Sequence, residues 1–276
     1  MGAFEKQGAR LHLIAQVDQE TVTLLTSPQG PGSDGVQAMA ADTGLTPSFI
    51  ALLQALGWND KVFLRAALQG LPTGAEVAAL PGRWLAALWD EIGEALEARS
   101  EREAVANVLD LHRSAATGVA VNRTVWRKAR AAFVGSEAGV PGAVAAIVVA
   151  TAWDPLTTHG AFADAALLLP SLAEARWEAA SGWGAADDEE AQRLDEQAIT
   201  HGREQAGPTP SEDPGWYNTE EGEAWVQRFL AAYNAYGDTH GQRVRDRHEG
   251  IFQGREALQS RAKAILLDLI QGQHLG

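Results

Sequence analysis

The sequence predicts a mainly α-helical protein: a multi-helix bundle or irregular helical array with a small amino-terminal β-hairpin. Three observations lead to this fold class. Apolar residues recur at intervals of three and four from about residue 44 onward. Helix-start signals precede several of these stretches. Hydrophobic residues make up 46% of the 276-residue chain, which is enough for a buried core.

The expected hairpin comes first in the chain. Every second residue is apolar on each side of a possible turn at Asp18–Gln19, and these residues are Leu11, Leu13, Ala15, Val17, Val22 and Leu24. Such alternation is typical of half-buried strands. Residues 27–35 (SPQGPGSDG) have the composition of a flexible loop. We therefore expect residues 1–35 to hold a hairpin and a linker.

Capping residues indicate where helices begin. Thr46 stands before Pro47, and Asp60 stands before another apolar stretch, so each can accept a bond from an unpaired helix N–H. Ser171 with Glu174 forms a capping box. The sequence therefore predicts that one helix ends near Leu169 and that another begins at Ser171.

Composition divides the helical part of the chain into three regions. Residues 36–205 are expected to form the main helical domain. Residues 206–218 are a Pro-rich loop or linker, since Ala206–Gly215 contains three Pro. Residues 219–276 are expected to form a helical pair packing on the main domain. The first helix of that pair is capped by Thr219 and carries an aromatic stripe of Trp225, Phe229, Tyr233 and Tyr236.

Several classes of function have no support in the sequence. The chain has no Cys, which excludes disulfides, thiolate catalysis and thiolate zinc sites. It has no Gly-x-Ser-x-Gly motif and no Walker-type glycine loop. No secretory signal is recognisable, and the longest apolar run (residues 138–153) is too short for a membrane span. We expect a soluble, cytoplasmic protein without a cofactor or membrane partner, and a non-enzyme rather than an enzyme.

The charge is bipolar along the chain. The formal net charge is −14, which argues against general binding to nucleic acid. Residues 174–223, the acidic segment, contain 14 acidic and 3 basic residues. Residues 99–130 carry a net charge of +4, and residues 240–263 carry +3.

The sharpest basic feature is a predicted helix over residues 122–134. Arg123, Arg127 and Arg130 are spaced by four and three, which puts them on one helix face with Lys128 beside them. Arg guanidinium groups match phosphate geometry, so these four residues are candidates for an anion-binding site. The alternative is a solvated face, or one that pairs with the acidic segment.

The acidic segment supplies the candidate contacts for a protein partner. A helix opens there with Asp187, Asp188, Glu189 and Glu190, which suit the positive end of the helix dipole. Of the nine Trp, Trp183 and Trp216 flank Gly-rich and Pro-rich stretches, and we expect them to be the exposed pair. Exposed Trp residues are typical of binding hot spots. The alternatives are a solubilising surface and ordinary core tryptophans.

A metal site has only weak support. Three Asp-x-His pairs occur, which are Asp110/His112, Asp238/His240 and Asp246/His248. On a helix, residues two apart point about 200° from each other and cannot chelate together. His112 lies on an apolar helix face and is predicted to be a core histidine. Asp238 and His240 stand between two glycines, which suggests a loop, so they are the weak metal candidates.

Three functions remain as hypotheses. The first is a non-enzymatic module that binds a basic protein through the acidic segment. The second is a small-molecule-binding protein or enzyme with an inter-helix pocket, which would use His201, His240, Arg127 and Trp216. The third is a nucleic-acid-associated regulator that uses the basic faces at 123–130 and 243–263.

The general composition of the chain resembles that of Ala/Trp-rich acidic helical proteins of bacterial defence and toxin-neutralising systems. No motif is shared, so the resemblance assigns no residue a role. The sequence leaves the oligomeric state open.

Overall fold

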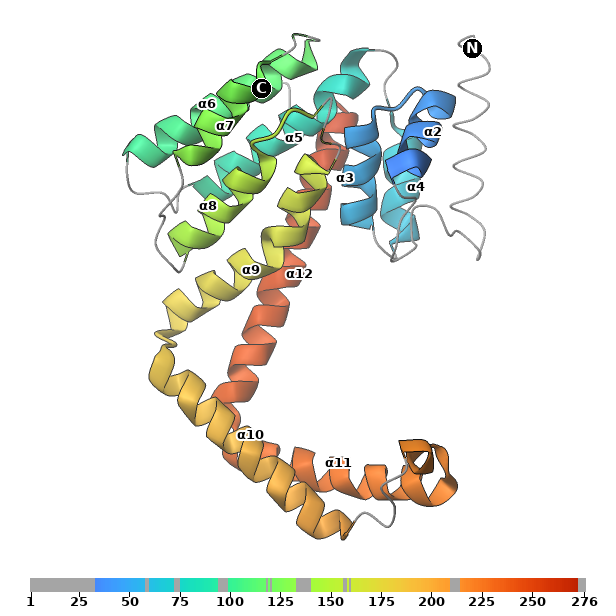
Figure 1. The fold of residues 1–276 in the computed structure, drawn as a ribbon, viewed down its shortest axis with the longest axis vertical. Helices are drawn as coiled ribbons and strands as arrows, with labels where there is room; N and C mark the ends of the chain where they lie inside the picture. The colour runs from blue at the N-terminus through green and yellow to red at the C-terminus, as the bar shows by residue number, and fades with distance from the viewer. Residues whose placement is uncertain are drawn as a thin grey trace. The chain divides into compact units, whose positions relative to one another are not determined.

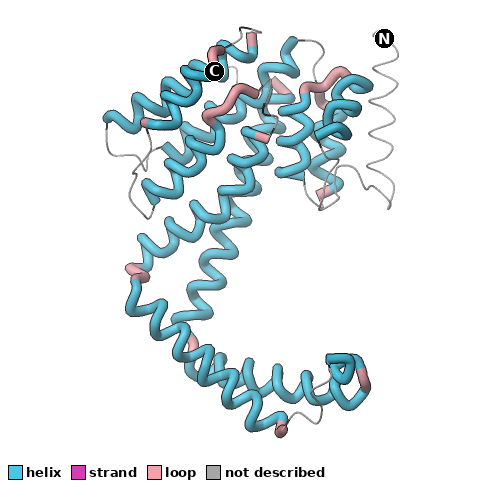
Figure 2. Tube along the Cα trace, in the orientation of Figure 1, coloured by secondary structure: helices cyan, strands magenta, loops and turns pink. Residues whose placement is uncertain are grey.

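All regular structure in the described part of the chain is helical (Figure 2). The computed structural model describes residues 33–57, 60–71, 75–93, 99–117, 119, 121–132, 140–155, 158, 160–208 and 214–272. These residues form eleven α-helices and a 3-10 helix, and no strand. The mainly α fold class is therefore confirmed. The β-hairpin predicted within residues 11–24 lies outside the described residues.

The helices belong to two compact units (Figure 1). Unit 1 comprises Met1–Ala175 and Arg255–Gly276, and unit 2 comprises Arg176–Gly254. The boundaries fall within helices α9 (Ala161–Ser181) and α12 (Gln242–Ile270), so each of these helices contributes residues to both units. This division differs from the one expected from composition, because the last residues of the chain belong to the same unit as the first helices.

Unit 1 contains seven complete described helices besides its parts of α9 and α12. They are α2 (Ser33–Thr43), α3 (Pro47–Gly57), α4 (Lys61–Gln69), α5 (Ala75–Ile92), α6 (Arg99–Ala116), α7 (Arg123–Ala131) and α8 (Val140–Thr151). Helix α2 begins inside the expected linker, so that part of the linker prediction is wrong. Val36 of α2 is buried in the core, and this packing outweighs the loop-like composition of its neighbours.

The core of unit 1 joins helices that are far apart in the sequence. Trp84 of α5 is 0% exposed, and its Nε1 donates a hydrogen bond to the carbonyl oxygen of Ala262 in α12 at 2.9 Å. Ile265 and Leu266 of α12 are buried in the same cluster. At the edge of this core, Lys263 Nζ lies 2.6 Å from Asp60 Oδ2. The carboxyl-terminal part of α12 is thus an integral element of unit 1.

The predicted helix starts at Thr46 and Asp60 are confirmed. The Phe49 amide donates to Thr46 Oγ1 at 3.2 Å, and the Phe63 amide donates to Asp60 Oδ1 at 2.9 Å. Pro47 occupies the first position of α3, where its missing N–H costs no helical bond.

The helix boundary predicted at Ser171 is wrong. Helix α9 continues through Pro170 and Ser171 to Ser181. A proline inside a helix removes one backbone hydrogen bond, which favours termination. Here Leu169 and Leu172, on either side of the proline, are both buried in the core. Their packing stabilises the continuous helix.

Unit 2 is built around two antiparallel helices, α10 (Ala185–Ala206) and α11 (Glu220–His240). A short 3-10 helix, η2 (Pro214–Asn218), precedes α11. Tyr233 Oη donates to Asp195 Oδ1 at 2.6 Å, and Phe229 packs on Gly202. Later residues of α11 therefore meet earlier residues of α10, as an antiparallel pair requires. The loop prediction for 206–218 holds at Gly207 and Pro208, residues 209–213 lie outside the described residues, and 214–218 form η2.

The predicted aromatic stripe of α11 is confirmed. The Trp225 and Phe229 rings stack with centroids 5.5 Å apart, and Phe229 and Tyr233 stack at 6.0 Å. The predicted Thr219 cap is also present, since Thr219 Oγ1 accepts a bond from the Gly222 amide at 3.1 Å.

None of the described helices combines the length and apolar character that crossing a lipid bilayer requires.

Candidate functional site

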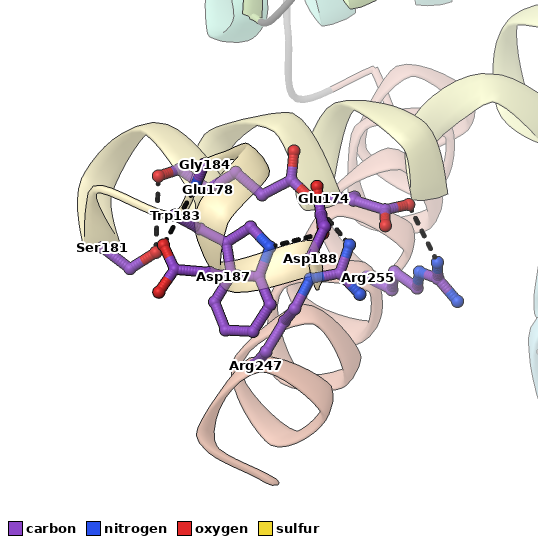
Figure 3. Close-up of polar contacts among 9 residues, drawn as sticks. All are labelled: Glu174, Glu178, Ser181, Trp183, Gly184, Asp187, Asp188, Arg247 and Arg255. Carbon is purple, nitrogen blue, oxygen red and sulfur yellow. Dashed lines mark hydrogen bonds and ion pairs between the residues drawn. The ribbon is translucent and has the colours of Figure 1, made fainter. Parts of the chain in front are cut away.

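Trp183 lies just before α10 among charged side chains (Figure 3). Its Nε1 donates to Asp188 Oδ1 at 2.8 Å. The guanidinium carbons of Arg247 and Arg243 lie 5.2 and 5.6 Å from its ring centroid. The Trp177 ring is 5.7 Å away. Trp183 is therefore half-buried and held by neighbours, rather than freely exposed as the sequence suggested.

The acidic first turn of α10 is partly neutralised by bases of unit 2. Asp187 Oδ2 accepts from the Gly184 amide at 3.0 Å, and Asp187 Oδ1 pairs with Arg243 Nε at 2.6 Å. These two interactions, the backbone bond first, hold the pKa of Asp187 below its usual value. Glu190 pairs with Arg193 at 2.5 Å. Asp188 and Glu189 are exposed to solvent.

The second predicted exposed tryptophan, Trp216, is also half-buried. It belongs to η2, and its ring lies 5.3 Å from Tyr217 and 6.3 Å from Trp225. The expectation of an exposed Trp pair is therefore wrong. The next residue, Tyr217, also contacts this aromatic cluster, with its ring 6.2 Å from Trp225, but it is 43% exposed.

A surface hollow of about 500 Å³ lies beside Tyr217 at the start of α11. Glu220, Glu223 and Val226 also line it. Neither glutamate has an ion-pair partner among the described residues. Sequence reasoning missed this site. The sequence signal for it is the pair Glu220 and Glu223, which come one and four residues after the Thr219 cap and therefore lie on the same helix face.

A larger cavity of about 680 Å³ lies between α10, α11 and the first part of α12. Tyr233, His240, Arg245 and His248 are among its lining residues. The bond from Tyr233 to Asp195, together with burial, raises the pKa of the Tyr233 phenol. A cavity of this size with several converging polar groups matches the general pattern of small-molecule sites.

The four residues named for the pocket hypothesis do not line one common cavity. His240 lines the larger cavity, whereas His201 lines a separate groove with Glu204 on α10. Trp216 packs in the aromatic cluster, and Arg127 belongs to unit 1.

Asp238 and His240 do not lie in a loop as predicted. Both occupy the last turn of α11, and Gly241 caps that helix. Two residues so spaced diverge around the helix, and the His240 ring lies 4.4 Å from Tyr236. In the part of the chain that the structure describes, no three His, Asp or Glu side chains cluster as metal ligands.

The two basic regions of the sequence differ in how their charge is balanced. Each basic residue of α12 pairs with an acid of the same unit. The pairs are Arg243–Asp187, Arg245–Asp238, Arg247–Glu178, Arg255–Glu174, Arg261–Glu91 and Lys263–Asp60. In contrast, Arg123, Arg127 and Lys128 of α7 are exposed and have no acidic partner among the described residues. Helix α7 therefore presents positive charge that α12 does not.

His112 is a core histidine, as predicted. It is 1% exposed, and its Nε2 lies 2.7 Å from the carbonyl oxygen of Thr151. Because the carbonyl can only accept, Nε2 carries the proton in the neutral ring. Burial lowers the pKa of His112 to about 4.

Comparison with protein-family models, curated proteins and solved structures gave no match to this chain.

Proposed function

We propose that this protein is a non-enzymatic binding module that holds a basic protein partner on the acidic surface of unit 2. The observation that carries the proposal is the hollow at the start of α11. There the exposed Tyr217 ring stands beside Glu220 and Glu223, two carboxylates without ion-pair partners among the described residues.

The hollow has the chemistry to receive a Lys or Arg side chain. The aliphatic stem of such a side chain would lie along Tyr217 and Val226, and its cationic end would meet the two carboxylates. A cation over an aromatic face contributes about 0.5–1 kcal/mol at an exposed site. A tyrosine anchor flanked by charge is also a common form of interface hot spot.

The charge of unit 2 favours such a partner over longer distances. Residues 176–254 contain 16 acidic and 7 basic residues. An excess of one sign on a surface accelerates encounter with a partner of opposite sign, and the effect weakens as salt is added. The first turn of α10 contributes to this field through Asp188 and Glu189, while Asp187 and Glu190 are largely balanced by arginines.

The proposal is tested with a fluorescently labelled arginine-rich peptide as the probe and the full chain as the binder. Fluorescence anisotropy over a series of salt concentrations should show saturable binding that weakens with salt. The double variant Glu220→Gln/Glu223→Gln should weaken binding about tenfold or more, since each lost charged contact contributes about 1 kcal/mol or more. Tyr217→Ala should also weaken binding.

A charge-matched control separates this site from general attraction. Glu189→Gln/Glu249→Gln removes the same two charges from unit 2 at exposed positions that do not line the hollow. This control should change the affinity by less than about threefold, as expected for rim charges. Equal losses in the two double variants would show that only the overall field acts, and the hollow would no longer be the site.

A second candidate function is supported by the cavity between α10, α11 and α12. Its volume of about 680 Å³ and its lining of tyrosine, histidine and arginine side chains suit an aromatic or polar small molecule. Anilinonaphthalene sulfonate should bind there with enhanced fluorescence. Val244→Trp, which places a large side chain in the cavity wall, should abolish that signal, and an unchanged signal would place the dye elsewhere.

A further inference from the structure

A second binding site, independent of unit 2, is suggested by the unpaired positive charge of α7. The six Lys and Arg residues of α12 are all paired with acids, whereas α7 carries three exposed cations, Arg123, Arg127 and Lys128, within six residues and without an acidic partner in the described part of the chain. A solvated basic face needs no further explanation by itself. The contacts of Arg130 and the cavity beside it supply the additional evidence.

Arg130 is fixed in position by two contacts in unit 1. Its Nη1 donates to the carbonyl oxygen of Ala152 at 2.6 Å, and its guanidinium carbon lies 3.6 Å from the Trp153 ring centroid. An Arg held by stacking and by a backbone bond loses little conformational entropy when it binds a ligand. Burial, and then the nearby charges of Arg123 and Arg127, lower the pKa of this guanidinium. The three arginines therefore repel one another, and an anion would relieve that repulsion.

A cavity of about 370 Å³ lies against these residues. Arg123 and Arg130 line it from α7, and Trp153 and Thr158 line it from the residues after α8. Trp126 also contributes to the wall. Its side chain is 1% exposed, and its Nε1–H has no hydrogen-bond acceptor among the described residues. The Trp126 ring therefore forms a rigid, buried part of the wall between the two arginines of α7.

We infer that this cavity binds a small phosphate monoester, with Arg123 and Arg130 on the phosphate oxygens and Thr158 beside them. A phosphate offers several acceptor oxygens, which suits a wall rich in donors. Asp154 also lines the cavity and adds one negative charge to it. This negative charge opposes the higher charge of a polyphosphate and so favours a single phosphate group.

The inference is tested on the full chain with glycerol phosphate as the probe. The readout is the indole N–H resonance of Trp126 in a ¹H–¹⁵N spectrum, assigned by its loss in Trp126→Phe. Saturable movement of this resonance is expected. Arg123→Gln and Arg130→Gln should each weaken the affinity about tenfold, the loss typical of one charge-assisted hydrogen bond. Arg228→Gln, at an exposed position on α11, is the matched control and should leave it unchanged.

The outcomes are distinguishable from failure to fold. Arg123 makes no structural contact with an acidic group in the described chain, so Arg123→Gln stays informative even if Arg130→Gln unfolds the region. No movement of the Trp126 resonance, or an equal response to acetate, would overturn the phosphate site. Much tighter binding of a single-stranded oligonucleotide than of glycerol phosphate would also overturn it, in favour of a nucleic-acid surface. Peptide binding by unit 2 is unaffected by any of these results.

Discussion

Replacing Gly202 by alanine should weaken the packing of α10 against α11. A β-carbon built on Gly202 would lie 2.8 and 2.9 Å from two ring carbons of Phe229 and 3.2 Å from the Phe229 carbonyl oxygen. The ring is itself stacked between Trp225 and Tyr233, so it has little freedom to move away. The carbonyl belongs to the α11 backbone and is still less free.

Two opposing terms set the size of the effect. Overpacking of one methyl group costs about 1–3 kcal/mol. Exchanging glycine for alanine within a helix recovers about 1 kcal/mol of intrinsic helix propensity. The net change for Gly202→Ala is therefore about 0–2 kcal/mol of lost stability. At Gly237 of α11 a β-carbon would meet no atom within 4 Å, so Gly237→Ala should stabilise by up to about 1 kcal/mol.

Urea unfolding followed by circular dichroism gives the free energy of unfolding of both variants, and hydrogen exchange of the α10 and α11 amides shows whether the change lies in this helix pair. The two should differ by about 1–3 kcal/mol, with Gly202→Ala the less stable. Adding Phe229→Leu to Gly202→Ala should recover part of the loss, since the smaller side chain leaves room for the methyl group. If Gly202→Ala were as stable as Gly237→Ala, the packing argument would be refuted.

Three further predictions follow from buried groups. The pKa of His112 is about 4 in the folded protein and 6.5 in the unfolded chain, so the unfolded chain binds a proton more readily. The free energy of unfolding should therefore have its full value above pH 6.5 and fall by about 3 kcal/mol as the pH drops to 4 and below. Urea unfolding at several pH values should show a smaller pH dependence in His112→Gln. Trp84→Phe loses the bond to Ala262 and should lower the free energy of unfolding by about 1–3 kcal/mol, and an unchanged urea midpoint would contradict this. Gly222→Ala would place a β-carbon against the backbone of Trp216, so it should reduce both the stability of unit 2 and arginine-peptide binding, measured by thermal unfolding and anisotropy.

The local features of the fold were predictable from the sequence because they depend on neighbouring residues. Thr46, Asp60 and Thr219 each bond an amide three residues ahead, a distance that the sequence displays directly. The aromatic stripe of α11 follows from helical spacing alone. The continuity of α9 through Pro170 did not follow, because it depends on how tightly Leu169 and Leu172 pack against distant helices.

The candidate sites were less predictable, because charge balance is set by contacts between distant segments. The four acids that open α10 look alike in sequence, yet Asp187 meets Arg243 more than fifty residues later and Glu189 meets no base among the described residues. Similarly, Trp216 and Tyr217 are adjacent and both contact Trp225, and only the turn of η2 decides that Tyr217 is the more exposed of the two. A sequence count of charges or tryptophans cannot distinguish such neighbours.

The bond between Trp84 and Ala262 has a consequence for the order in which the chain can fold during synthesis. The two partners are 178 residues apart, and Ile265 and Leu266 complete the same core. A ribosome releases the first helices of unit 1 long before the segment that covers them. Until that segment emerges, Trp84 lacks its acceptor and part of the core faces solvent. Unit 1 can therefore complete its core only after the residues of unit 2 have been translated.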